Sequence, residues 1–179
     1  SGQSLKNCRF IKFKNMKFIE RNLKVAVFGL MNTDITAYGV KKFLKQGEQT
    51  VGGILKIGPG GKSRNISSMI SVLLGKGKVA MIGETVRDDF NLWKVPFYDL
   101  EKYGVITDFI KISDFKETKK FPGIALIIVD KNGKNQIYVL PGINEDFNTR
   151  KVDNVEEIFK ILQKNKGVIV LTLEMIYKT

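Results

Sequence analysis

The chain has 179 residues, of which 30 are basic and 18 acidic, with no histidine and one cysteine. The absence of histidine excludes a Ser-His triad and a histidine-ligated metal, and the single cysteine, Cys8, excludes an internal disulfide and a thiolate zinc cluster. Hydrophobic residues make up 43% of the chain, enough for the core of one domain, yet no apolar run approaches the roughly 18 residues that a membrane-spanning helix requires.

The first 24 residues carry half of the net charge of +12, with seven basic residues against Glu20 alone. They contain no apolar segment typical of a signal peptide, so we expect a cytoplasmic protein with no membrane partner. A basic segment that includes Phe10 and Phe13 is a candidate for contact with nucleic acid, but a solvated extension is the simpler interpretation. We therefore predict a basic N-terminal extension over residues 1–23, no nucleic-acid partner, and one domain over residues 24–179.

The pattern of apolar residues predicts alternating strands and helices after the extension. In chain order we expect a strand over 24–31, a strand over 50–57, a helix after Gly61, a strand over 78–82, a helix over 88–103, strands over 124–129 and 136–140, a helix over 155–162 and a strand over 167–173. Apolar strands that alternate with helices indicate an α/β fold with a parallel sheet covered on both faces.

Two predicted pieces do not fit that parallel sheet. The strands over 124–129 and 136–140 are joined by a loop that contains Asn132-Gly133, which predicts an antiparallel hairpin. This hairpin and the strand over 50–57 predict a small β appendage beside the main sheet. The apolar run over 167–173 is typical of a central parallel strand, yet the chain ends six residues later, so we expect the first part of a longer fold.

The segment Gly60-Gly61-Lys62-Ser63 suggests a phosphate-binding loop, but the spacing fails because that motif requires a glycine at position 56, which is Lys56. Two glycines ahead of a helix still let a ligand approach the backbone and the helix N-terminus, with Lys62 and Asn65 near the same spot. A polyhydroxylated or anionic ligand would suit this loop, and a tight packing turn is the alternative interpretation.

Polar residues also follow the first and last predicted strands of the sheet. Asn32 and Asp34 come after the first strand, and Glu174 comes after the last. In open α/β sheets ligands bind beyond the carboxyl ends of the strands, and a carboxylate beside an amide can bond vicinal hydroxyls. An Asn/Asp turn is the alternative for the first pair. We predict that these residues and the glycine loop converge on one site.

Together these residues resemble the ribokinase-like carbohydrate kinases of the phosphofructokinase-B type, from about residue 24 to the end of the chain. The matching segments occur in the family's order: Val25–Asp34, Gly47-Glu48 with Thr50, Gly60-Gly61-Lys62 with Asn65, Asp88-Asp89, Pro122–Asn144 and Leu171–Glu174. Several matches in register are far more specific than any one of them. The resemblance implies a ribokinase-like parallel sheet flanked by helices, with a small β-sheet lid formed by strands at about 35–57 and 120–140.

The resemblance implies ATP-dependent phosphorylation of a primary hydroxyl of ribose or of a related sugar or nucleoside, with ATP and Mg²⁺ as cofactors. It implies that Ala125 and Ile127 are lid residues over the apolar side of the sugar, and that the lid sheet forms a homodimer. The further sugar-binding positions that it implies are Asn32, Asp34, Gly60, Gly61, Lys62, Asn65 and Glu174.

Two departures from the family pattern stand out. Ser63-Arg64 replaces a pair of small residues, and Arg64 is bulky. The family's Gly-Ala-Gly-Asp segment, which supplies the anion hole, the catalytic base and the opening of the nucleotide site, is absent from this chain. We therefore assign no catalytic residue and expect these 179 residues alone to be inactive. The alternative is a non-catalytic module that binds a sugar or nucleoside.

Overall fold

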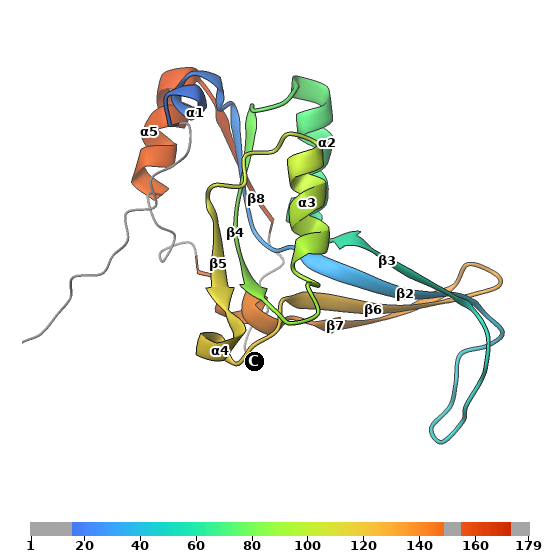
Figure 1. The fold of residues 1–179 in the computed structure, drawn as a ribbon. Coiled ribbons are helices and arrows are strands. Elements are labelled where there is room, and N and C mark those ends of the chain that lie inside the picture. The colour runs from blue at the N-terminus through green and yellow to red at the C-terminus, as the bar shows by residue number, and fades with distance from the viewer. Residues whose placement is uncertain (1–15, 149–154, 173–179) are drawn as a thin grey trace, which may run out of the picture.

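A computed structural model describes residues 16–148 and 155–172 of the chain (Figure 1). Its main sheet contains four parallel strands in the order β5-β4-β1-β8. The strands span Val25–Phe28 (β1), Val79–Arg87 (β4), Ile110–Asp114 (β5) and Val168–Leu171 (β8). All four residues of β1 are buried, as expected for a strand covered on both faces.

Helices cover both faces of this sheet, which confirms the predicted α/β fold (Figure 1). Helices α1 (Met16–Asn22) and α5 (Val155–Asn165) cover one face, where Ile19 and Ile158 meet Phe28 and Ile82. Helices α2 (Lys62–Leu74) and α3 (Lys94–Lys102) cover the other face, where Leu100 packs with Val27 and Met81. The strands thus contribute alternate side chains to two apolar clusters.

The second sheet is the predicted β appendage, here called the lid sheet. Its order is β3-β2-β6-β7, with β2 (Asn32–Val40) and β6 (Gly123–Asp130) parallel and central. Strands β3 (Ile54–Gly60) and β7 (Asn135–Leu140) pair antiparallel at its two edges. The lid sheet projects from the main sheet beside the lower end of α3 (Figure 1). Short helices α4 (Phe115–Thr118) and η1 (Gly142–Asp146) flank β6 and β7 in the chain.

The N-terminal extension is partly folded. Residues 16–23 form α1 and its exit, and both Ile19 and Leu23 are buried in the core. Asn165 fastens this segment by donating hydrogen bonds to the carbonyls of Glu20 and Leu23, both at 2.9 Å. Residues 1–15 lie outside the described part of the chain.

Several strands begin or end at residues other than those predicted. The first strand ends at Phe28, and the chain passes within three residues into β2, so Asn32 and Asp34 start a lid strand and do not end a core strand. The glycine-rich segment 58–60 belongs to β3, where Pro59 is tolerated because β3 is an edge strand. Strand β8 stands at the edge of the described sheet, where a central strand was expected.

Helix α3 begins at Lys94, six residues later than predicted, because Asp88 ends the preceding strand in a turn. The buried Asp88 carboxylate accepts hydrogen bonds from the backbone N–H groups of Phe90, Leu92 and Trp93 at 2.9–3.2 Å. Pro96 then falls in the first turn of the helix, where a missing N–H leaves no bond unmade. None of the helices described in residues 16–148 and 155–172 is long and apolar enough to cross a membrane.

Candidate sugar-binding site

Five of the predicted site residues share one face of the lid sheet. Asn32 lies opposite Gly60 of β3, and Asp34 lies opposite Ala125 of β6. Ile127 is two residues further along β6 and therefore on the same face. Residues directly opposite in a sheet point to the same side, so these five positions form one surface, here called the Asp34 face.

Glycines keep this face open next to the polar groups. A Cβ atom at Gly60 would collide with the Asp34 carboxylate, and one at Gly123 would collide with the side-chain amides of Asn32 and Asn144. Gly61 has φ of +91°, and its Cβ would lie 2.7 Å from the Leu30 carbonyl oxygen. The contacts at residues 60 and 61 are those of the alternative interpretation, a tight turn that packs α2 against the start of β2, and the approach of a ligand to this backbone stays a prediction.

A buried amide holds Asn32 in place. The Asn144 Nδ2 donates to the Met31 carbonyl oxygen at 3.1 Å and to Asn32 Oδ1 at 2.8 Å. Because the Met31 carbonyl oxygen can only accept, the Asn144 atom that meets it must be the amide nitrogen. The Asn32 atom that accepts from this nitrogen must therefore be the side-chain oxygen. The Asn32 Nδ2 is left as a donor. Asn144 was not among the predicted site residues, although it is the last residue of the segment matched to the family's lid hairpin.

The start of α2 brings a second amide to the same region. Asn65, in the first turn of α2, accepts a hydrogen bond at Oδ1 from Arg64 Nη2, and the same nitrogen donates to the Pro59 carbonyl oxygen at 2.7 Å. Lys62 is the exposed first residue of the helix, directly after Gly61. The N-cap of this helix is Gly61, which has no side chain, and the positive end of the helix dipole lies there.

Asp34 is the acceptor among these groups. Burial of its half-buried side chain raises the pKa of the carboxyl, and the nearby positive charge of Arg64 partly offsets that rise. A carboxylate that has lost part of its hydration is a strong acceptor for hydroxyl groups. The cluster therefore combines one carboxylate acceptor with two amide donors.

The structure describes only part of the predicted convergence between the end of the last strand, the start of β2 and the glycine loop. Glu174 lies outside the described residues. Two residues before it, the Thr172 hydroxyl is hydrogen-bonded to the Ser63 hydroxyl, which also accepts the Leu30 N–H at 3.1 Å. The exits of β8 and β1 thus meet the N-terminus of α2, at the carboxyl edge of the sheet.

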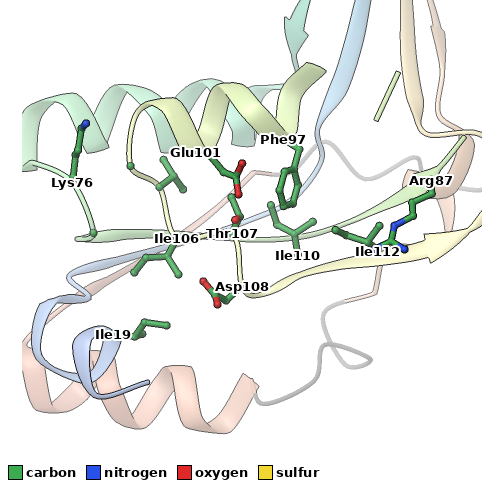
Figure 2. Close-up of a pocket in the computed structure, with 13 residues that line it drawn as sticks. Ile19, Lys76, Arg87, Phe97, Glu101, Ile106, Thr107, Asp108, Ile110 and Ile112 are labelled. Atoms are coloured by element: carbon green, nitrogen blue, oxygen red, sulfur yellow. The ribbon is translucent and has the colours of Figure 1, made fainter. Parts of the chain in front are cut away.

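A cleft of about 770 Å³ lies elsewhere, along the edge of the main sheet (Figure 2). It extends between Ile19 of α1 and the α3 residues Phe97 and Glu101, with Arg87 at one end and Lys76 at the other. None of the predicted sugar-binding residues lines it. The cleft exists because β5 pairs only with the second half of β4. On the β5 side, the first half of β4 has a single bridge, from Ala80 to Ile106.

Comparison with known protein families assigns the chain to the family whose motifs these site residues resemble. Residues 22–173 match the profile of the pfkB family carbohydrate kinases. This chain belongs to the pfkB family. The resemblance drawn from the Asn32, Gly60 and Asn144 segments is thereby confirmed at the level of the family.

Ribokinases are prominent among the pfkB relatives. The chain is 31% identical over 140 residues to the ribokinase of Schizosaccharomyces pombe, covering 75% of this chain and 42% of that protein. It is 29% identical over 154 residues to the ribokinase of Dictyostelium discoideum, covering 84% of this chain and 43% of that protein. The chain thus spans less than half the length of either curated relative.

A solved structure confirms the ribokinase-like fold. The Arabidopsis thaliana ribokinase, solved in complex with ribose and ATP, matches with a TM-score of 0.67 at 18% identity. The match covers 87% of this chain and 55% of that structure. At this identity the likeness speaks for the fold of the pfkB chain and not for its ligands.

Proposed function

We propose that this chain is the acceptor-binding part of a sugar kinase that transfers phosphate from ATP to a primary hydroxyl of ribose or of a related sugar or nucleoside. The pfkB family match and the two ribokinase relatives support the reaction class. The observation that carries the proposal is the placement of the Asp34 carboxylate against Gly60 and opposite Ala125, on the face that also carries Asn32.

The polar groups of this face complement a polyol. A sugar hydroxyl can donate its proton to Asp34 and accept a hydrogen bond from the amide Nδ2 of Asn32 or Asn65. Ala125 and Ile127 supply the apolar surface over which carbon atoms of the ring can lie. Such a set holds an acceptor hydroxyl in a fixed orientation, which is a large part of catalysis in phosphoryl transfer.

Lys62 and Glu174 complete the proposed acceptor site by family resemblance. Lys62 would contribute a positive charge beside Gly61, and Glu174 would accept a further hydroxyl. In the part of the chain that the structure describes, no group of three acidic or cysteine side chains could hold a metal ion. We propose that the kinase uses ATP and Mg²⁺ and acts in the cytoplasm, and we assign no residue of this chain to either cofactor.

The first test is calorimetric titration of the 179-residue chain with D-ribose, D-fructose and adenosine. We expect saturable binding of at least one of them, and binding of none would contradict the proposed site. A coupled assay for ADP release in the presence of ATP, Mg²⁺ and the bound sugar is expected to show no turnover by this chain, since it lacks the family's catalytic segment. Measurable ADP release would refute the proposed inactivity.

The non-catalytic alternative differs in one outcome. A protein that joins this chain to a segment with the family's Gly-Ala-Gly-Asp motif should phosphorylate the bound sugar if the kinase proposal is right. A pure binding module would bind the sugar equally well and release no ADP in that extended form.

We also propose that the lid sheet forms a homodimer through the side opposite the Asp34 face. That side, here called the Tyr138 face, carries large apolar residues in register from all four strands. Those that are exposed are Leu55, Ile57, Leu126, Tyr138 and Leu140. An exposed apolar surface of this kind is typical of an interaction site, and a second copy of the chain would cover it.

A further inference from the structure

Arg64 is a buried arginine where the family pattern has a small residue. It lies in the first turn of α2 and is 9% exposed. Its Nη1 donates to Asp99 Oδ2 of α3 at 2.6 Å, and its Nη2 donates to the Pro59 carbonyl oxygen at 2.7 Å and to Asn65 Oδ1. One side chain therefore joins a core helix, the end of lid strand β3 and an expected sugar-binding residue.

Packing alone does not account for a guanidinium at this place. Burying a charge requires a partner and full hydrogen bonding, and an apolar residue of similar volume would avoid that requirement. Asp99 supplies the partner, and Ser68 donates a further bond to the same Asp99 oxygen at 3.4 Å. The Arg64 Nε nonetheless has no hydrogen-bond partner among the described residues. The arrangement is therefore costly for stability, which directs attention to what the Nη2 contacts achieve.

The Nη2 contact decides how Asn65 presents its amide. A free asparagine side chain can turn either its oxygen or its nitrogen toward a ligand. Guanidinium has donors only, so Arg64 can bind only the Asn65 oxygen. The Asn65 Nδ2 is thereby turned away from Arg64 as a donor. At the same time the bond to Pro59 fixes the end of β3 next to Gly60, which contacts Asp34.

We infer that Arg64 is a positioning residue for sugar binding: it fixes the Asn65 amide as a hydrogen-bond donor and holds the lid strand at Pro59, with Asp99 as its anchor. This inference rests on the proposed sugar site. Most of the effect of removing Arg64 on sugar affinity should therefore depend on Asn65, and only the smaller part that acts through the Pro59 contact and the charge near Asp34 should persist when Asn65 is absent.

A double-mutant cycle measured by calorimetry with D-ribose tests this dependence on the full chain. We expect Arg64→Ala to weaken ribose binding roughly tenfold, and to weaken it much less in the Asn65→Ala background. Lys102→Ala, which removes an exposed cation from the last turn of α3, is the control and should leave the affinity unchanged. An equal loss from Arg64→Ala in both backgrounds would overturn the inference.

A second measurement does not need the sugar. The NMR order parameter of the Asn65 side-chain NH₂, identified by its loss in Asn65→Ala, should be high in the wild type and low in Arg64→Ala, while that of Asn132 in the exposed hairpin loop should not change. Arg64→Lys keeps a charge opposite Asp99 but lacks the forked donors, so it gives the same test if Arg64→Ala does not fold.

The two measurements separate the inference from the proposed function. An ordered Asn65 amide that loosens without Arg64, in a chain that binds no sugar, would contradict the sugar site and retain the positioning role. Sugar binding together with an Asn65 amide that is equally mobile in both chains would retain the site and overturn the role of Arg64.

Discussion

Gly60 has no side chain at the point where the Asp34 carboxylate occupies the adjacent space, so the two residues are sterically coupled. Gly60→Ala should displace the carboxylate and weaken ribose binding by about tenfold or more, by calorimetry. Gly58→Ala is a matched control, because Gly58 lies in the same strand on the same face and a Cβ there meets nothing within 4 Å. Equal affinities of the two variants would contradict this coupling.

Asp34 also has a predictable effect on stability. Burial raises its pKa in the folded state above that in the unfolded chain, so the folded state binds more protons between the two values. The free energy of unfolding should therefore fall as the pH rises from the ordinary carboxyl pKa through the raised one. Denaturant titrations at a series of pH values should show this slope in the wild type and its loss in Asp34→Asn. Parallel pH profiles of the two proteins would show that burial does not perturb this carboxyl.

At the scale of elements, the Asp88 turn sets where α3 begins. Its carboxylate uses both oxygens to accept three backbone N–H groups while nearly excluded from solvent. Asp88→Asn would place an amide NH₂ against one of these N–H donors, and should lower the free energy of unfolding by about 1–3 kcal/mol. Asp89→Asn, at the exposed neighbouring position, should have little effect in the same denaturation experiment. Equal losses in both variants would argue against the capping role.

The elements that sequence predicts well have a continuous apolar run or a characteristic turn. Strand β1, strand β8 and the first half of β4 are such runs, although the side chains of β8 are mostly exposed at the edge of the described sheet, and the Asn132-Gly133 hairpin has its own turn chemistry. The apolar pattern alone did not predict strand β2, in which only Thr33 and Val40 are buried, whereas the family resemblance implied a lid strand from about residue 35. Helix α1 was missed because its few apolar residues stand within a basic segment.

Helix α2 shows why a helix can be predicted while its packing is not. Its apolar residues Met69 and Leu73 are 67% and 80% exposed. Its buried side is rich in serine, with Ser67 donating to the Ser63 carbonyl oxygen and Ser71 to that of Tyr103. Small hydroxyl side chains that bond to the backbone let two helices approach closely. The spacing of apolar residues cannot predict packing of this kind.

In the candidate site, too, some residues could be predicted from the sequence and others could not. The positions of Asn32, Asp34, Gly60 and Asn65 could be predicted because the motif spacing is local. The contribution of Asn144 could not be derived from spacing, since it meets Asn32 from 112 residues away. The contacts of Arg64 likewise depend on Asp99 in another helix.

At the scale of the whole molecule, the Tyr138 face makes a prediction about assembly. If a second copy covers this face, the chain should elute with twice the monomer mass in light scattering coupled to gel filtration. Tyr138→Lys should shift it to the monomer mass, because burying an unpaired lysine in the interface is costly. Tyr98→Lys, which changes an exposed tyrosine of α3, should remain dimeric. A wild-type chain that is monomeric at high concentration would contradict the dimer.

The central claim is that the Asp34 carboxylate binds a sugar hydroxyl, and titration of D-ribose into the wild type, Asp34→Asn and Asp108→Asn tests it most directly. Asp108 is an exposed carboxylate that lines the separate cleft at the sheet edge. The predicted result is saturable binding by the wild type and by Asp108→Asn, with affinity at least tenfold lower in Asp34→Asn. Ribose binding that is unchanged in Asp34→Asn, or absent from the wild type, would contradict the account.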